Sequence, residues 1–335
     1  MNEPDATHGL GRREFLAASI ATSLAAALPS RPAFADETFP TRPLIGLVAA
    51  SAGGAFDLLL RMVQPAWERE LGQPIRPTFA PGAAGQIAVT QMLGQPLDGH
   101  AFGVDAITNL AVMVHYSQPK HFDLDSLAFI GTLQIEPVAL LVRKDAPWTD
   151  IGAFLADARA GRTIKVGVGG NRVFYHLVAA AFKKEAGAKA MPLITYQGGG
   201  ASRNALLGGE VDAVVTGLYA AAPIFDQVNG LVVFDDRNPV SDRLPMATSE
   251  RLDFELPATL HPTGIYVPAE LRKKFPDRFD KLVRTFQAAM ENPATRAAGT
   301  KMGMPEAAFV YWGPDQLAAY KEKLKKALDA YGGLL

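Results

Sequence analysis

A β-strand pattern gives way to a helix pattern within the segment Val166-Gly167-Val168-Gly169-Gly170-Asn171-Arg172-Val173-Phe174-Tyr175-His176. The same order occurs near the start of the chain, where the apolar run 44–48 leads into Ser51-Ala52-Gly53-Gly54-Ala55-Phe56-Asp57 and then into apolar residues at helical spacing. The first N–H groups of a helix lack intrahelical partners, and the positive end of the helix dipole lies there. Two such helix starts predict a carboxylate-binding cleft between two lobes.

Composition excludes several classes of protein. At 335 residues the chain is longer than one core usually supports, so two domains are expected. A net charge of −1 gives no electrostatic reason to expect nucleic acid or an anionic membrane as a partner. The absence of cysteine excludes thiol nucleophiles, thiolate metal sites and disulfides.

The first 35 residues have the pattern of an export signal. Arg12 and Arg13 precede an uncharged, alanine-rich run that ends near Leu28, and Ala33-Phe34-Ala35 provides a small-x-small cleavage site. We therefore predict a twin-arginine signal peptide over 1–35, cleavage after Ala35 and a periplasmic mature protein. A general secretory signal that carries Arg-Arg, or a retained anchor, is the alternative.

From residue 36 onward, short apolar runs alternate with helix-period segments. This alternation is typical of α/β proteins with largely parallel sheets. Strands are expected at 44–48, 74–79, 101–104, 139–142, 163–168, 193–196, 212–216 and 231–234. Helices are expected at 57–70, 85–94, 150–160, 173–186, 200–208, 219–228, 268–290 and 314–331. The last helix places its apolar residues on one face and is expected to dock on a lobe, and the irregular stretch 235–262 is expected to cross back between lobes as a hinge.

The usual signatures of catalysis and cofactor binding are missing. There is no His-Glu-x-x-His motif, no phosphate-binding Gly-x-x-x-x-Gly-Lys-Ser/Thr loop and no Gly-x-Ser-x-Gly elbow. The run from Gly167 begins like a dinucleotide fingerprint, but Arg172 stands where its third glycine would be. The six histidines do not pair at metal-ligand spacings on one helix. We therefore expect no catalytic residue, cofactor or metal.

Asp57 and Arg172 are the charged residues at the two helix starts. A carboxylate in the first turn complements the helix dipole, so a structural role is favoured for Asp57 over that of a catalytic acid. Arg172 offers a bidentate fork for a carboxylate, with a solvated surface position as the alternative. The aromatic residues Phe56, Phe174 and Tyr175 would either pack inward or make the pocket bulkier and less hydrated.

Taken together with their surroundings, these loops resemble the periplasmic substrate-binding receptors of tripartite tricarboxylate transporters, the Bug-type family. The resemblance runs from about Pro43 to Leu335 and rests on the joint order of several short motifs. These are Gly53-Gly54 with Asp57 and Arg61, Pro81-Gly82-Ala83-Ala84-Gly85-Gln86, Asp98-Gly99-His100, Phe122-Asp123, Gly167 to Asn171 with His176, Tyr196-Gln197-Gly198-Gly199-Gly200, and Leu206-Leu207-Gly208-Gly209-Glu210-Val211-Asp212.

The resemblance implies a periplasmic-binding-protein-like type II fold, with two Rossmann-like lobes joined by crossover strands and a ligand cleft between them. We place lobe 1 at 36–141 and 257–335 and lobe 2 at 142–256. It further implies that two loops grip a carboxylate like pincers, 51–56 in one lobe and 169–174 in the other. The implied ligand-binding residues are Ser51, Ala52, Gly53, Gly54, Ala55, Phe56, Asp57, Gly169, Gly170, Asn171, Arg172, Val173, Phe174, His176, Tyr196, Gly198 and Gly199.

Both loops depart from the family pattern. The first commonly reads Pro-Gly-Gly-Gly and then a small or hydroxyl residue, where this chain has Ala52, Ala55 and Phe56. The second commonly has glycine and Thr or Ser after the asparagine, where this chain continues from Arg172 to Tyr175. We hypothesise that Arg172 replaces the lost hydroxyls and that the added rings suit a flat or longer carboxylate.

The predicted function is a monomeric receptor that captures a small organic carboxylate, possible classes being aromatic or dicarboxylic, and delivers it to membrane permease subunits. Hinge closure would let the permease distinguish the closed form from the open one. The first alternative is a ligand sensor for a membrane signalling protein. The second is a hydrolase or isomerase that uses Asp57 or His176, with Arg172 holding the anion.

Overall fold

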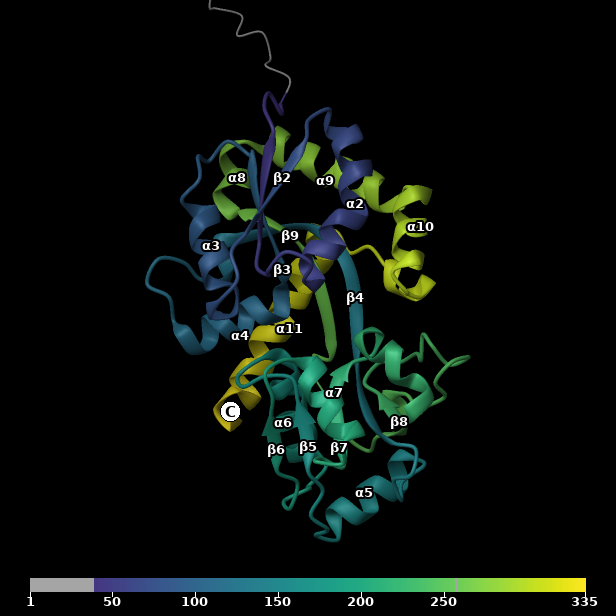
Figure 1. Cartoon of the computed structure of the whole chain (residues 1–335). Helices are drawn as coiled ribbons and strands as arrows, with labels where there is room; N and C mark the ends of the chain where they lie inside the picture. Colours follow the sequence, from purple (N-terminus) through teal and green to yellow (C-terminus); the bar gives the residue numbers. More distant parts are fainter. Residues whose placement is uncertain (1–38, 257) are drawn as a thin grey trace, which may run out of the picture. The chain divides into compact units, whose positions relative to one another are not determined.

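The computed structural model describes residues 39–256 and 258–335 (Figure 1). The predicted signal peptide over 1–35 lies outside the described residues. Residues Pro40–Leu335 form one compact unit. None of the helices in these described ranges is long and apolar enough to cross a membrane.

The first part of the chain builds a parallel sheet of three strands with helices between them. Strand β1 pairs with β2 on one side and with β3 on the other, both in parallel. The elements are β1 (Leu44–Val48), α2 (Ala55–Leu71), β2 (Ile75–Phe79), the 3-10 turn η1 (Ala83–Gly85), α3 (Gln86–Leu93), β3 (Ala101–Ala106) and α4 (Ile107–Ser117). In this lobe, Trp67 packs its ring 4.9 Å from both Phe102 and Phe286, so α2 and a later helix share one core.

The middle of the chain repeats the arrangement in a second lobe. Strand β5 pairs in parallel with β6 and β7, and β7 and β8 both pair antiparallel with β4. The 3-10 turn η2 (Leu124–Ser126), which contacts α4, and the long strand β4 (Leu127–Arg143) lead into this lobe. The elements that follow are α5 (Ile151–Arg159), β5 (Val166–Val168), α6 (Phe174–Glu185), β6 (Leu193–Thr195), α7 (Gly199–Leu207), β7 (Ala213–Gly217), η3 (Tyr219–Gln227), β8 (Val228–Val233) and η4 (Ser249–Arg251).

The last part returns to the first lobe. Its elements are β9 (Leu260–Pro268), α8 (Ala269–Lys274), α9 (Pro276–Glu291), α10 (Pro293–Lys301), η5 (Glu306–Phe309), α11 (Pro314–Tyr331) and η6 (Gly332–Leu334). The single helix expected over 268–290 is two helices, because Pro276 forces the residue before it out of helical geometry and Phe275 adopts φ −136° and ψ 62°. The segment expected as a helix over 219–228 is a 3-10 helix that contains Pro223.

Two long strands, β4 and β9, join the lobes. They pair antiparallel along Leu127 to Pro137 of β4, and from Val138 onward β4 pairs instead with β7 and β8 (Figure 1). The strand order is therefore β2-β1-β3-β9-β4-β7-β5-β6, with β8 also on β4. The expectation of largely parallel sheets holds for the outer strands only, because β4 and β9 run antiparallel to their neighbours. The predicted lobe boundary after residue 141 falls inside β4, and the lobe limits stay a prediction.

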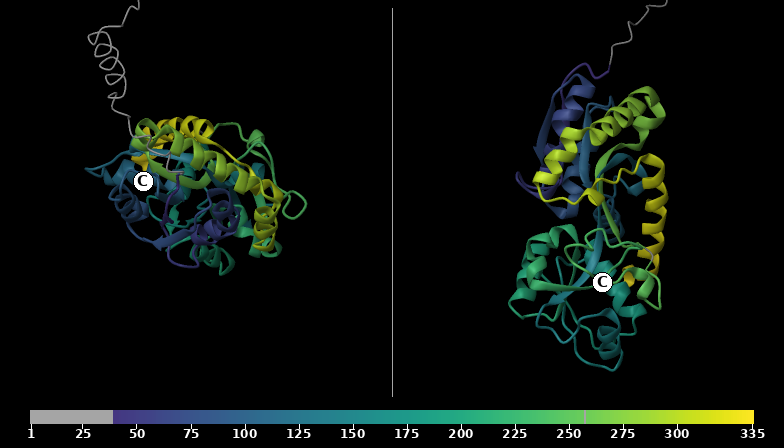
Figure 2. Two further views of the ribbon diagram at one scale, coloured as in Figure 1. Left: turned by 90° about the horizontal axis from the view of Figure 1, so that it is seen from above. Right: turned by 90° about the vertical axis from the view of Figure 1, so that its right-hand side faces the viewer.

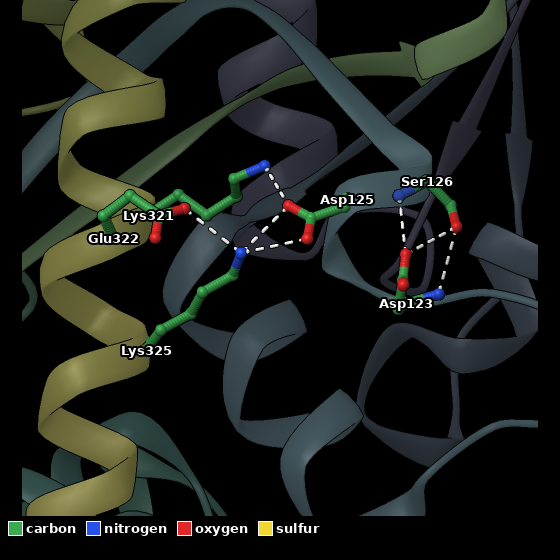
Figure 3. Close-up of polar contacts among 6 residues, drawn as sticks. All are labelled: Asp123, Asp125, Ser126, Lys321, Glu322 and Lys325. Carbon is green, nitrogen blue, oxygen red and sulfur yellow. Dashed lines mark hydrogen bonds and ion pairs between the residues drawn. The ribbon is translucent and has the colours of Figure 1, made fainter.

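The terminal helix α11 contacts elements of both lobes. It packs on α4 and β4 and, near its end, on α6, so it lies along the junction instead of on one lobe (Figure 2). Its apolar face is buried through Leu317, Tyr320, Leu324 and Leu328. On its polar side, Lys321 and Lys325 bind Asp125 at 2.6 and 3.0 Å, next to the capping pair of Asp123 and Ser126 (Figure 3).

Candidate functional site

A cavity of about 510 Å³ lies where the crossover strands meet the starts of α2 and α7. This volume is in the usual range for small-molecule sites. Its floor comes from alternate residues of β4 and β9, since Gln134 lies opposite Thr263 and Glu136 lies opposite His261 in the register of the two strands. The lining residues are Ala55, Phe56, Leu58, Leu59, Gln134, Glu136, Tyr175, Gly199, Gly200, Arg203, Thr216, Gly217, Tyr219, Ala220, His261, Thr263 and Met302 to Met304.

Glu136 is a buried carboxyl group on this floor. Its Oε1 accepts a hydrogen bond from the Ala220 backbone N–H at 2.7 Å, and its Oε2 accepts one from the Tyr175 hydroxyl at 2.9 Å. Burial raises the pKa of Glu136, while these two donors and the nearby Arg203 act in the opposite direction. The side chain packs directly on the backbone of Gly217, where an added Cβ would lie 2.2 Å from Oε2. The carboxyl group is therefore held in place from several sides.

Arg203 provides the cationic side chain of the cavity. It comes from the second turn of α7, and its Nη1 donates to Thr216 Oγ1 at 3.3 Å. Burial lowers the pKa of Arg203, and the negative charge of Glu136 partly offsets that shift. Within residues 39–256 and 258–335, Arg203 makes no salt bridge, so guanidinium donors remain for an anion in the cavity.

His261 lines the same floor as a neutral group. Its ring stacks on that of Phe174 with the two centroids 5.4 Å apart, and its centroid lies 5.0 Å from that of the Tyr175 ring. The His261 Nδ1 is 2.5 Å from Thr108 Oγ1. Burial lowers the pKa of His261 to about 4. At neutral pH the imidazole therefore contributes hydrogen bonding but no charge.

Of the first predicted loop, only Ala55 and Phe56 line the cavity. Asp57 is 1 % exposed, accepts the Gly53 N–H at 2.7 Å and pairs with Arg61 at 2.8 Å. Gly53 has φ 78°, a conformation that favours glycine. Asp57 thus closes the loop onto the start of α2, which is the structural role that its position in the first turn suggests. The remaining members of the loop, Ser51, Ala52 and Gly54, lie outside the lining.

The second predicted loop, Gly169 to Phe174, does not line this cavity. Arg172 has a left-handed backbone with φ 51°, and its guanidinium lies 5.1 Å from the ring of Tyr116. Its Nε makes a long contact of 3.4 Å with the carbonyl oxygen of Leu335. The structure therefore directs Arg172 toward α4 and the carboxyl terminus.

The residues around Arg172 differ in their surroundings. Phe174 is fully buried and stacks on His261. His176 lines a separate hollow of about 390 Å³ together with Lys183 and Lys184. Gly170, Asn171 and Val173 lie outside both linings.

A third predicted segment, around Tyr196, Gly198 and Gly199, meets the second loop. An added Cβ on Gly169 would lie 2.7 Å from the backbone of Gly199, so only glycine lets these two loops approach so closely. Gly199 lines the cavity, and Gly198 is the N-cap of α7. Tyr196 instead points its hydroxyl toward Glu210, at 3.4 Å.

Several lining residues were not among the predicted site residues: Gln134, Glu136, Tyr175, Arg203, Thr216, Tyr219, His261 and Thr263. The sequence does contain a signal for the cavity floor. Gln134 and Glu136 are polar residues two positions apart inside an otherwise apolar run, a spacing that places both on the same face of a strand. No comparable local signal marks Arg203 as different from any other arginine on a helix. In the described part of the chain, no group of three or more His, Asp or Glu side chains is arranged to hold a metal ion.

Comparison with known proteins identifies the family. A family profile described as "Tripartite tricarboxylate transporter family receptor" matches residues 59–326. The chain belongs to this family. The receptor is therefore a solute-binding protein and not an enzyme, which confirms the predicted family, fold class and absence of catalysis.

Individual similarities extend over nearly the whole receptor. It is 28 % identical over 329 residues to a UPF0065 protein in the gbd 5′ region of Cupriavidus necator, which covers 96 % of this chain and 98 % of that protein. A TctC solute-binding protein from Polaromonas superposes with a TM-score of 0.74 at 24 % identity, and the superposition covers 88 % of this chain and 98 % of that protein. The R. palustris protein Rpa4515, solved with adipate, superposes with a TM-score of 0.70 at 20 % identity, again over 88 % of this chain and 98 % of that protein. These likenesses support the two-lobed fold.

Proposed function

We propose that this receptor works in the periplasm, where it captures a small organic carboxylate in the cavity between its lobes and delivers it to the membrane permease of a tripartite transporter. The Arg203 guanidinium carries the proposal, because it faces the cavity and makes no salt bridge within residues 39–256 and 258–335. A guanidinium forms charge-assisted, often bidentate hydrogen bonds with carboxylates. The family assignment and the adipate complex of Rpa4515 support the same ligand class.

The start of α7 adds backbone donors to Arg203. Its N-cap is Gly198, which supplies no side-chain cap, and Gly199 and Gly200 line the cavity. The free N–H groups and the positive end of the helix dipole favour an anion at this position. One ligand carboxylate could thus be held between the helix start and the guanidinium, four residues further along the same helix.

Closure is the second part of the proposal. The lobes are connected by β4 and β9, so a change of backbone angles near the middle of these strands would move one lobe relative to the other. Closure would bring loops 51–56 and 169–174 together over the ligand as the predicted jaws, exclude water and strengthen the charge interactions. The permease would then distinguish the closed receptor from the open one. The proposal includes export by the predicted twin-arginine signal, which would give a mature chain that begins at Asp36.

Ligand-induced thermal stabilisation of the mature receptor tests the proposed ligand class. The panel contains monocarboxylates, dicarboxylates, tricarboxylates, amino acids and uncharged amides of matched size. A ligand at 100 times its dissociation constant stabilises the folded state by about 2.7 kcal/mol, which corresponds to a shift of several degrees. We expect at least one carboxylate to shift the midpoint while its amide does not. If every carboxylate leaves the folded receptor unshifted, the proposed function is wrong.

A further inference from the structure

The cavity is lined by an acidic side chain, Glu136, as well as by a basic one, Arg203. The two oxygens of Glu136 face the Ala220 N–H and the Tyr175 hydroxyl, and the Arg203 guanidinium lies nearby, an arrangement that suits the ionised carboxylate. The pKa of His261 is lowered to about 4, so its imidazole adds no charge at neutral pH. With Glu136 ionised, its charge and that of Arg203 cancel. A ligand with two carboxylates would add two negative charges to a site whose own charge is already balanced, and one of them would face Glu136 in a poorly hydrated environment.

Glu136 is placed to accept more than it does now. Each oxygen of a carboxylate has two lone pairs, and the donors around Glu136, which are the backbone N–H groups of Ala220 and Tyr219 and the Tyr175 hydroxyl, do not occupy all four. The carboxyl group is buried against Gly217, so it cannot swing out to solvent when a ligand enters without losing these bonds. Because burial raises its pKa, its ionised form would gain strongly from a cationic group brought in by the ligand.

Building on the proposed function, we propose that the receptor selects amino-carboxylates over dicarboxylates, with Arg203 holding the ligand carboxylate and Glu136 accepting hydrogen bonds from its ammonium group. Such a ligand brings one charge of each sign and leaves the cavity balanced. The pairing also sets an orientation, since Arg203 lies on α7 in one lobe and Glu136 lies on the crossover strand β4. This ligand class differs from that of Rpa4515, whose complex holds adipate.

Isothermal titration calorimetry with matched ligands tests this selectivity. One aliphatic series consists of 6-aminohexanoate, adipate and hexanoate, and one aromatic series consists of 4-(aminomethyl)benzoate, terephthalate and 4-methylbenzoate. In at least one series we expect the amino-carboxylate to bind the wild-type receptor at least 10-fold more tightly than the dicarboxylate. The variant Glu136→Gln should reduce this ratio at least 10-fold, because the neutral amide forms no ion pair with ammonium and no longer repels a carboxylate. The control Glu70→Gln removes an equal charge from an exposed position on α2 and should leave the ratio unchanged.

The outcomes separate this inference from the function on which it rests. Equal or tighter binding of the dicarboxylates, or an unchanged ratio in Glu136→Gln, would overturn the selectivity while carboxylate binding stands. If no compound of either series binds, the selectivity is wrong, while the proposed function stands as long as another carboxylate of the thermal-shift panel binds. If Glu136→Gln does not fold, the pH dependence of binding to the wild-type receptor tests the selectivity instead. Affinity for the amino-carboxylate should fall on acidification, because Glu136 becomes protonated. Affinity for the plain monocarboxylate should fall less.

Discussion

Two arginines of the second lobe, Arg172 and Arg203, have side-chain positions opposite to those that the sequence suggests. The arginine expected to bind a ligand points away from the cavity, and the other one faces it. Arg172 stands in a glycine loop before a helix, where we hypothesised from the sequence that it replaces lost hydroxyls as a carboxylate clamp, yet its guanidinium lies over Tyr116 and near the Leu335 carbonyl. Arg203 stands inside a helix with no distinguishing motif, yet it faces the cavity beside Thr216. The difference shows that the direction of a side chain, and not the character of its loop, determines which arginine can reach a ligand.

The physical cause lies in what each helix start is packed against. The loop that carries Arg172 turns through a left-handed residue, and α4 and the carboxyl terminus provide its aromatic ring and carbonyl oxygen. Helix α7 instead begins close to Gly169 and runs along the cavity edge, so its second turn points Arg203 inward. The contrast between the two arginines can be tested by substitution.

The largest expected effect belongs to Arg203→Gln. Hydrogen bonds to charged groups contribute about 1.5–3 kcal/mol, so the affinity for the best carboxylate should fall by about 10- to 100-fold. Calorimetry on the wild type and the variant measures this loss directly. The control Arg76→Gln removes the same charge from an exposed position on β2 and should change affinity little. An Arg203→Gln receptor that keeps wild-type affinity would eliminate Arg203 as the carboxylate partner.

A smaller effect, on the free energy of unfolding, is expected from His261, a residue of the cavity floor whose ring stacks on Phe174 of the second loop. The pKa of His261 is lowered from 6.5 to about 4, so the folded state binds the proton less well than the unfolded chain. The resulting stabilisation is fully present above pH 6.5 and is lost as the pH falls toward 4. Between pH 7 and pH 5 this linkage corresponds to about 2 kcal/mol of unfolding free energy.

Chemical denaturation at several pH values measures the His261 contribution. His261→Gln should flatten the decrease in stability between pH 7 and pH 5, even if the variant is less stable at pH 7. His121→Gln, which changes an exposed histidine, provides the comparison and should keep the wild-type slope. A slope that His261→Gln leaves unaltered would show that this imidazole is not buried as described.

The smallest effect is expected for Arg172→Gln. Loss of the contact between the guanidinium and the Tyr116 ring should cost about 0.5–1 kcal/mol of stability, because the arginine is largely exposed. Ligand affinity should change less than about 3-fold, well below one decade in the dissociation constant. A double-mutant cycle with Tyr116→Leu should give a non-additive stability change. An affinity loss as large as that of Arg203→Gln would instead support the arginine clamp predicted from the sequence.

Much of the fold could be predicted because strand and helix periods are local properties. The expected helix over 314–331 coincides with α11, and the expected strand over 44–48 coincides with β1. Strand β4 was expected only over 139–142, because Gln134 and Glu136 interrupt the apolar run and Gly131 weakens it. Helix α4 was missed because it is apolar on nearly all sides, which leaves no amphipathic period to detect.

The candidate site was predictable in part. Glycine loops before helices indicated Ala55, Phe56 and Gly199, which line the cavity. Glu136 and His261 could not be paired from the sequence, because they are 125 positions apart and meet only through the antiparallel register of β4 and β9. The spacing of Glu136 from Arg203 depends in addition on how α7 packs against β7.

The sequence by itself determined the class of protein: the order of strands and helices, the glycine loops at helix starts and the family to which the chain belongs. These properties depend on residues close together in the chain, or on the order of short motifs along it. Tertiary structure alone decided which charges share the cavity, because Glu136, Arg203 and His261 come from three separate elements. Burial shifts the pKa of each of these groups, and the proximity of Glu136 and Arg203, which no local sequence pattern connects, partly offsets the shift for both.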